Sequence, residues 1–307
     1  MSVIRAYRLL LFALPILAAS NSNISAVAQE SRILYNGEVT GGETVYEVQP
    51  GDILYKIAVK LGTSFPAIAR ANSIKNPNQI FAGQKLVIAS RKIIPRILDE
   101  GVLINIPEYR LYFFHNREVV DVYPIAVGLK TWRIPTGSFK IIRKIQNPTW
   151  YMPEGMAKRL GVEREIIPPG PLNPVGDLWI GLDMDHVGIH STNQPMSIGK
   201  SLSHGCIRLY PWDAHKLFDA VELGMLGEII YEPIKVSLEG KDIFLEVHED
   251  VYRFIPNMEE EALRKLSEFG IMEDIDLEKV KETVKKTQGL PVKVNKTQNK
   301  NSSIYYY

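Results

Sequence analysis

The chain has 307 residues, and its 36 lysine and arginine residues nearly balance 35 aspartate and glutamate residues, for a formal charge of +1. This balance gives no reason to expect a nucleic-acid partner, which usually requires a basic surface. The length exceeds that of one small hydrophobic core and predicts two or more domains.

The first residues predict export. Arg5 and Arg8 precede a short apolar run at residues 9–19, and Ala-Val-Ala follows at 26–28. This order is typical of a signal peptide, and the run is shorter than the ~20 residues that a membrane span needs. We therefore expect a signal peptide over residues 1–28, a periplasmic or cell-wall location, and no stable membrane span after cleavage. An uncleaved anchor is the alternative.

A compact module is expected at residues 44–89, after a polar linker at 36–42. A strand that alternates apolar and polar residues ends at the turn signal Pro50-Gly51. Asp52 and Ser64 are each placed to cap a short helix, and a second strand is expected at 85–88. The order strand, helix, helix, strand predicts one small α+β domain.

This module resembles a LysM domain over its whole length. The resemblance is carried by residues 46–54 (YEVQPGDIL), Ile57-Ala58, Asn72 and residues 80–86 (IFAGQKL). Ile53 departs from the pattern, which usually has threonine or serine at this position. LysM domains bind glycan strands that contain N-acetylglucosamine, so the resemblance implies a sugar groove lined by Gly51, Asp52 and the stretch from Asn76 to Ile80. A spacer without affinity for sugar is the alternative.

Strands dominate the next part of the chain, from residue 97 to residue 232, which follows a basic linker at 91–96. Runs of β-branched and aromatic residues occur at 102–106, 110–114 and 119–127. Residues 152–174 are rich in proline and glycine, and so long a loop is typical of a functional or disordered segment. A helix that begins at Pro211 is expected to pack on the sheet. These patterns predict a mainly β domain.

The C-terminal segment, residues 233–292, is expected to hold a hairpin with its turn at Glu239-Gly240 and two helices, at 258–269 and 277–286. The polar residues 293–307 are expected to form a disordered tail.

Cys206 is the one cysteine of the chain, within residues 203–209 (SHGCIRL). His190 ends a predicted strand at 186–190, and a strand end followed by a loop can bring it close to Cys206. A cysteine beside a histidine allows acyl transfer, because the histidine raises the thiolate fraction and later returns the proton to the leaving amine. The main-chain N–H groups of Gly205 and Cys206 are candidates for holding the oxyanion.

Three other roles for Cys206 are open from the residue types alone. The first is a buried structural cysteine. The second is a metal site, but no familiar zinc spacing relates the candidate ligands Asp185, His186, His190, His204 and Cys206. The third is a redox cysteine, which needs a second thiol. We therefore expect no metal and no cofactor.

Residues 102–231 resemble the catalytic domain of the YkuD-type L,D-transpeptidases, which implies a sandwich-like or barrel-like β fold. The family pattern stands here as His190-Ser191, a loop, and then Ser-His-Gly-Cys with Arg208 two residues later. Further matches lie at residues 104–107 (INIP), 123–128 (YPIAVG), 134–139 (IPTGSF), 147–150 (NPTW) and 169–174 (PGPLNP). The last match is typical of the subgroup that includes enzymes attaching lipoprotein to peptidoglycan. Ser191 departs from the commoner glycine.

The resemblance implies roles for individual residues. Cys206 would be the nucleophile and His190 the general base and acid, with the main-chain carbonyl of Ser191 holding the other ring nitrogen. His204 and Arg208 would support them. Arg208 would either hold a substrate carboxylate or brace the loop.

The implied activity is that of an exported peptidoglycan L,D-transpeptidase. The donor is a stem tetrapeptide, and the acceptor is an amine on another stem, a lysine of a lipoprotein, or water. A non-catalytic wall-binding protein is the alternative from a different class.

The remaining histidines and tryptophans have ordinary roles in this interpretation. His186 is expected to be a plain strand residue, and His115, His215 and His248 to be surface or helix-face residues. For Trp132, Trp150 and Trp179, core packing is favoured over a place in a substrate cleft.

Overall fold

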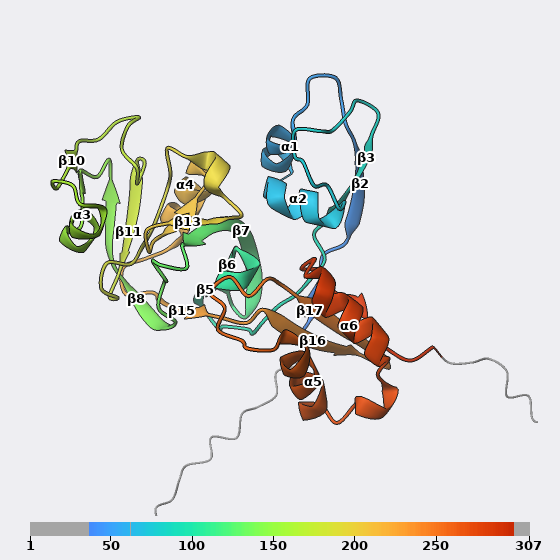
Figure 1. The fold of residues 1–307 in the computed structure, drawn as a ribbon. Helices are drawn as coiled ribbons and strands as arrows, with labels where there is room; N and C mark the ends of the chain where they lie inside the picture. The colour runs from blue at the N-terminus through green and yellow to red at the C-terminus, as the bar shows by residue number, and fades with distance from the viewer. Residues whose placement is uncertain (1–36, 62, 298–307) are drawn as a thin grey trace, which may run out of the picture. The chain divides into compact units, whose positions relative to one another are not determined.

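The computed structural model describes residues 37–61 and 63–297, so the expected signal peptide lies outside the described residues. Three groups of elements follow one another along this part of the chain, and Figure 1 labels most of them. None of the helices in the described ranges is long and apolar enough to cross a membrane.

The N-terminal module has the predicted order of elements. Strand β2 (Glu43–Glu47) pairs antiparallel with β3 (Lys85–Ala89), and helices α1 (Leu54–Lys60) and α2 (Phe65–Ala71) lie between them in the sequence. Apolar residues of all four elements or their flanks form a separate core that includes Leu54, Ile57, Ile68 and Leu86. The module therefore has its own hydrophobic interior.

One of the two predicted helix caps is confirmed and the other is wrong. The Ser64 hydroxyl accepts a hydrogen bond from the Ala67 N–H at 3.3 Å, as an N-cap does. Helix α1 starts only at Leu54, so Asp52 lies too early to cap it. The Asp52 carboxylate instead closes the preceding turn, accepting from the Gln49 N–H at 2.8 Å.

The two linkers that flank this module pair with each other. Strand β1 (Val39–Thr40) runs antiparallel to β4 (Lys92–Ile93). Segments predicted only as linkers thus form a short ladder, because they are brought together where the chain enters and leaves the module.

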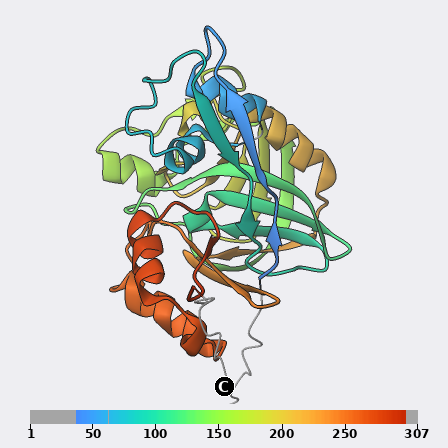
Figure 2. The ribbon, with the colours of Figure 1, turned by 90° about the vertical axis from the view of Figure 1, so that its right-hand side faces the viewer.

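The second group is a closed β sheet, seen from two directions in Figures 1 and 2. Its strands follow the order β13-β7-β14-β12-β11-β8-β15-β5-β6, and a further pairing of β6 with β7 closes eight of the nine strands into a ring. The strands are β5 (Gly101–Asn105), β6 (Arg110–His115), β7 (Glu118–Gly128), β8 (Gly137–Gln146), β11 (Leu178–Leu182), β12 (Gly188–His190), β13 (Ser201–Ser203), β14 (Ile207–Leu209) and β15 (Leu226–Ile230). The prediction of a mainly β, barrel-like domain is confirmed.

Ring closure depends on the length of β7. Its first part pairs with β6, from Glu118 to Pro124, and its last residues pair with both β14 and β13. One strand of eleven residues therefore joins the two ends of the sheet. The 3-10 turn η1 (Ile106–Glu108) connects β5 to β6.

Side chains alternate between the two faces of the strands, so one face of the sheet packs into the apolar core and the other carries the candidate site residues. Leu178, Ile180, Ile189, Ile207 and Leu209 belong to one buried core. Helix α4 (Pro211–Ala220) adds Ala214, Leu217 and Phe218 to the same core, as its predicted apolar face requires. The residues between these positions, Trp179, His190 and Arg208, therefore point the other way.

The long loop after β8 contains structure of its own. Strand β9 (Trp150–Tyr151) pairs with β10 (Ile166–Ile167), and α3 (Glu154–Leu160) lies between them. Fully buried Asn173 fastens the end of this loop, donating to the Pro148 carbonyl at 2.8 Å. The 3-10 turn η2 (Pro195–Ser197) lies in the loop between β12 and β13.

The C-terminal segment has the predicted hairpin, β16 (Ile234–Glu239) with β17 (Asp242–Val247), and the predicted helices α5 (Met258–Glu268) and α6 (Leu277–Lys286). The 3-10 turn η3 (Met272–Asp274) connects the helices. These elements share a core of their own.

The expected start of a disordered tail at Lys293 is wrong. Strand β18 (Val292–Lys293) pairs with β17, and the next residue, Val294, is fully buried in the C-terminal core. Two apolar residues, Val292 and Val294, pack on the C-terminal core and are enough to add this edge strand in a polar sequence. Residues 298–307 lie outside the described part of the chain.

Candidate active site

Strand register brings His190 and the cysteine segment together. Strands β12 and β14 are parallel neighbours, with Ile189 opposite Ile207 and His190 opposite Arg208. Cys206 precedes Arg208 by two residues, so it lies on the same face of the sheet and beside Gly188. Cys206 is partly exposed, and its thiol lies 3.5 Å from the main-chain oxygen of His186.

The predicted strand at 186–190 begins later than expected. His186 adopts a left-handed backbone conformation with φ of 61°, and β12 starts at Gly188. His186 is exposed, and its main-chain carbonyl rather than its ring lies beside the thiol.

The imidazole of His190 is fixed on two sides. Its Nδ1 lies 2.5 Å from the main-chain oxygen of Ser191. A carbonyl oxygen only accepts, so Nδ1 carries the proton and Nε2 keeps a free lone pair. Trp179, opposite His190 on β11, stacks on the imidazole with ring centroids 5.6 Å apart and planes 19° from parallel. Core packing was the predicted use of Trp179, and this contact corrects that prediction.

The surroundings of the His190 imidazole and of the Cys206 thiol favour the uncharged form of each group. Burial, helped by the nearby charge of Arg208, lowers the pKa of His190 to about 3. Burial raises the pKa of the Cys206 thiol to about 11, although the Gly188 main chain and Arg208 act in the opposite direction. At neutral pH the thiol therefore keeps its proton and the imidazole is neutral.

Arg208 is buried on the same face and only partly paired. Its side chain donates from Nη1 to the Gln194 Oε1 at 3.2 Å, while Nε has no hydrogen-bond partner among the described residues. The contact with Gln194 braces the loop after β12, and the open Nε–H leaves a donor for another group. Both predicted uses of Arg208 are compatible with this arrangement.

His204 and Gly205 lie in the turn between β13 and β14. The edge of the His204 ring meets Trp132, with centroids 5.2 Å apart and planes 84° apart. The Arg159 guanidinium of α3 lies 3.9 Å above the same indole. Gly205 has φ of 102°, a conformation that favours glycine. Trp132 is thus partly buried and packs beside His204, and it is not the core residue that was predicted.

The candidate sugar-binding residues of the N-terminal module have different surroundings. Gly51 is exposed with φ of 86°, while the Asp52 carboxylate is engaged within its own turn. The Asn76 side chain accepts from the Asn78 N–H at 3.1 Å, and Ile80 packs against the core of the module. Ile53 and Phe81, which are next to two of these residues, are exposed apolar side chains, 50% and 71% exposed.

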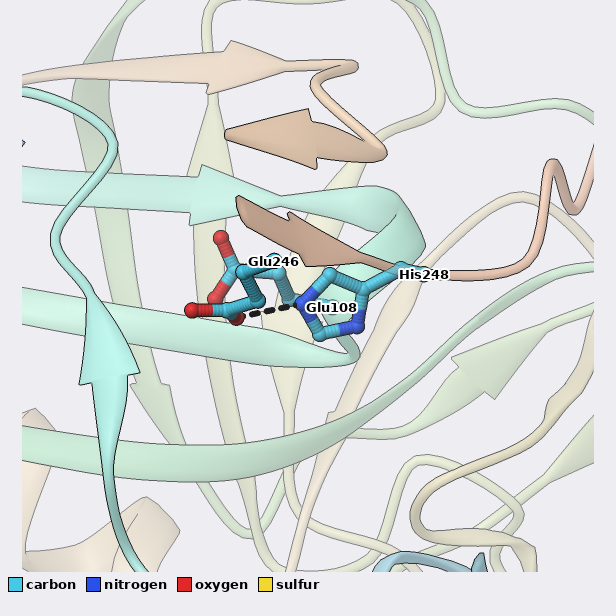
Figure 3. Close-up of side chains that lie close together, drawn as sticks. All are labelled: Glu108, Glu246 and His248. Atoms are coloured by element: carbon cyan, nitrogen blue, oxygen red, sulfur yellow. Dashed lines mark hydrogen bonds and ion pairs between the residues drawn. The ribbon is translucent and has the colours of Figure 1, made fainter. Parts of the chain in front are cut away.

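A buried ionic cluster lies away from the thiol, formed by Glu108, Glu246 and His248 (Figure 3). One ligand-type atom of each lies within 4.8 Å of the others, which is close enough to hold a metal ion. The Lys235 ammonium already lies among them, 2.6 Å from Glu108 and 2.9 Å from Glu246. Lysine thus supplies the positive charge that the two carboxylates need.

His248 belongs to this cluster, with its Nε2–H donating to the Glu246 Oε1 at 2.6 Å, and is 4% exposed. Its predicted place on the surface is wrong, because the hairpin carries it into the interior. Within the described residues, no such metal-competent group forms from Asp185, His186, His190, His204 and Cys206.

Comparisons with known proteins agree with both resemblances. Residues 99–236 match the model of the YkuD L,D-transpeptidase catalytic domain, and residues 46–89 match the LysM domain. A probable L,D-transpeptidase of Escherichia coli K12, YcfS, is 33% identical over 274 residues, which cover 84% of this chain and 85% of that protein. A probable L,D-transpeptidase of Salmonella typhimurium, ErfK/SrfK, is 30% identical over 70% of this chain and 73% of its own length.

Among solved structures, the catalytic domain of the E. faecium L,D-transpeptidase is 23% identical. The match covers 43% of this chain and 97% of that one, with a TM-score of 0.36.

Proposed function

The chain belongs to the YkuD family of L,D-transpeptidases, and on this premise we propose that it is an exported peptidoglycan L,D-transpeptidase with Cys206 as its nucleophile. The observation that carries the proposal is the parallel pairing of β12 with β14, which sets His190 opposite Arg208, two residues after Cys206. The neutral states of thiol and imidazole at neutral pH define how the first step starts.

In the first half-reaction, Sγ of Cys206 attacks the carbonyl between residues three and four of a donor stem tetrapeptide. The thiol proton passes to Nε2 of His190 as the C–S bond forms, because the raised pKa of Cys206 leaves most of the thiol protonated at neutral pH. The main-chain N–H groups of Gly205 and Cys206 hold the oxyanion. His190 then gives its proton to the leaving nitrogen, the C–N bond breaks, and D-alanine leaves a thioester on Cys206.

In the second half-reaction, an amine attacks the thioester. His190 takes the proton of this amine, the new amide forms, and the sulfur leaves and regains a proton. An amine on another stem gives a 3→3 cross-link, and a lysine of a lipoprotein gives covalent attachment. Attack by water gives trimming of the stem. Arg208, with its open Nε–H, is suited to hold a carboxylate of the peptide.

The LysM module gives the enzyme its second partner, the glycan strand. Gly51, Asp52, Asn76 and Ile80 are the proposed groove residues, with exposed Ile53 and Phe81 as apolar faces for a sugar ring. A periplasmic or cell-wall location is part of the proposal, and this partner and the sequence of residues 1–28 support it.

The products formed from defined substrates test the proposal. The protein is incubated with a disaccharide tetrapeptide, first alone, then with an excess of a second stem and then with a lysine-ended acceptor peptide. Release of D-alanine with a new amide to one acceptor supports transpeptidation and identifies the acceptor. Absence of D-alanine release from all three mixtures would refute the proposed activity.

The second candidate is a non-catalytic wall-binding protein. The raised pKa of the Cys206 thiol agrees with it in one respect, since only a small fraction of the thiol is ionised at neutral pH. Sedimentation with insoluble peptidoglycan, without D-alanine release and without an adduct on Cys206, is the result that this candidate predicts.

A further inference from the structure

The side chain of Ser191 is tied to the start of the neighbouring strand. Its Oγ donates to the Asp177 Oδ1 at 2.6 Å and accepts from the Asp177 N–H at 2.9 Å. Asp177 directly precedes β11, and Ser191 directly follows β12. One hydroxyl thus joins adjacent ends of two antiparallel strands.

The main chain of Ser191 is held from the same direction. Its N–H donates to the Leu178 carbonyl at 3.2 Å, and its own carbonyl receives the His190 Nδ1–H. The orientation of that carbonyl therefore depends on how the residue is clamped to Asp177 and Leu178. Ser191 is fully buried, so water does not substitute for these contacts.

Gly176 leaves room for the Ser191 hydroxyl because it has no side chain. A Cβ atom at Gly176 would lie 2.1 Å from the Ser191 Oγ, and Gly176 has φ of 66°. Asp177 is held on its outer side by α4, where the His215 Nε2 lies 2.7 Å from the other carboxylate oxygen. Partial burial would raise the pKa of Asp177, but the hydrogen bonds from Ser191 and His215 outweigh it and leave the pKa below its usual value. Asp177 is thus a carboxylate at neutral pH, which accepts both bonds.

We propose that Asp177 is a positioning residue for His190, acting through the Ser191 hydroxyl, and that His215 steadies Asp177 from the helix that follows the cysteine strand. The inference rests on the proposed function, because the tautomer of His190 matters only if His190 takes part in that reaction. Asp177 does not touch the reacting atoms. It fixes the Ser191 carbonyl that keeps the His190 proton on Nδ1 and leaves Nε2 free to take the thiol proton.

The test uses the full chain carrying Asp177→Ala, Ser191→Ala or both, with Asp177→Asn as the conservative variant. Asp183→Asn is the matched control, since that exposed carboxylate ends the same strand and accepts from the Lys140 N–H at 2.7 Å. Two quantities are measured: the rate of acylation of Cys206 by a disaccharide tetrapeptide, and the tautomer of His190 by ¹H–¹⁵N NMR. Thermal melting establishes that each variant is folded.

We expect Asp177→Ala and Ser191→Ala each to slow acylation about tenfold to a hundredfold, as small misplacements of a catalytic group do. The double variant should be no slower than the slower single variant, because both changes break one link. Asp177→Asn should recover most of the rate, since its amide oxygen still accepts from Ser191. His190 should lose its pure Nδ1–H form in both alanine variants and keep it in Asp183→Asn.

Additive rate losses, or an unchanged His190 tautomer in folded Asp177→Ala and Ser191→Ala, would overturn the inference. A wild-type protein that does not react with the tetrapeptide would refute the proposed function instead. In that case the NMR measurement still decides whether Asp177 controls the His190 ring.

Discussion

His190 Nδ1 lies 2.5 Å from the main-chain oxygen of Ser191, the residue that follows it in the chain. In the proposed mechanism, the third member of the catalytic group is thus a backbone carbonyl and not a carboxylate. Such an acceptor orients the ring and selects the tautomer but adds no full negative charge. Burial, together with the nearby charge of Arg208, lowers the pKa of His190 and favours a neutral imidazole.

Trp179 should contribute to both the placement and the acidity of His190. Replacing it with leucine removes the stacked ring, and aromatic pairs of this kind are worth about 0.5–1.5 kcal/mol. Acylation of Cys206 should slow by about two- to tenfold. Burial is the largest cause of the low His190 pKa, so partial exposure should move that pKa upward from about 3. NMR titration of His190 checks this, with Trp179→Phe as a control that keeps a ring; an unmoved pKa in the leucine variant would contradict it.

The resting thiol should behave as a weak acid. Because the pKa of Cys206 is raised to about 11, the thiolate fraction grows tenfold for each pH unit across the neutral range. Alkylation of the free protein by iodoacetamide should therefore accelerate steadily from pH 6 to pH 9. A rate that levels off between pH 5 and pH 8 would instead indicate a preformed thiolate–imidazolium pair.

Alanine substitutions at two glycines with similar φ angles distinguish the effect of steric crowding from that of backbone strain. Gly176 has φ of 66° and faces the Ser191 hydroxyl, while Gly161 has φ of 68° and open space around its Cβ position. Alanine at Gly161 should cost only the left-handed strain, about 1–2 kcal/mol of unfolding free energy. Alanine at Gly176 should cost more and also slow acylation. Urea unfolding and acylation rates test this; equal losses at the two positions would show that crowding against Ser191 is unimportant.

The buried cluster of Figure 3 should depend strongly on its lysine. Burial alone would raise the pKa of Glu246, but Lys235 and His248 hold it at about 2. Lys235→Met removes the ammonium shared by two buried carboxylates and leaves Arg110 Nη1, 3.9 Å from Glu108; losing one partner of a buried ion pair costs about 3–5 kcal/mol in other proteins. Lys286→Ala breaks an exposed pair with Glu282 on α6 and should cost below about 1 kcal/mol. Urea unfolding of both variants measures the difference, and similar losses would contradict the account.

Local patterns were sufficient for much of the architecture. The strands from Gly101 to Gly128, the C-terminal hairpin, helices α5 and α6 and the order of the N-terminal module follow from periodicity and turn residues close together in the sequence. The closure of the sheet was not predictable in this way, because the pairing of β6 and β13 with different parts of β7 is a property of the whole ring.

The candidate site likewise contains residues that a local motif predicts and residues that only the folded chain brings together. Cys206 and His190 stand in a recognisable motif, and parallel pairing of their strands sets them on one face. Asp177 and His215 were missed because each is distant in sequence from Ser191 and carries no local motif. His248 was misplaced because its partner Glu246 belongs to a buried cluster with Lys235 and Glu108, which come from other elements. A buried ion pair formed across elements leaves no periodic trace in the sequence.

The site of covalent attachment tests the central claim most directly. The protein is incubated with a disaccharide tetrapeptide, quenched in acid, digested and analysed by mass spectrometry beside a folded Cys206→Ala variant. The account predicts an acyl group, equal to the donor less D-alanine, on the peptide that contains Cys206 and no adduct on the variant. An adduct on a different residue, or D-alanine release by Cys206→Ala, would contradict it.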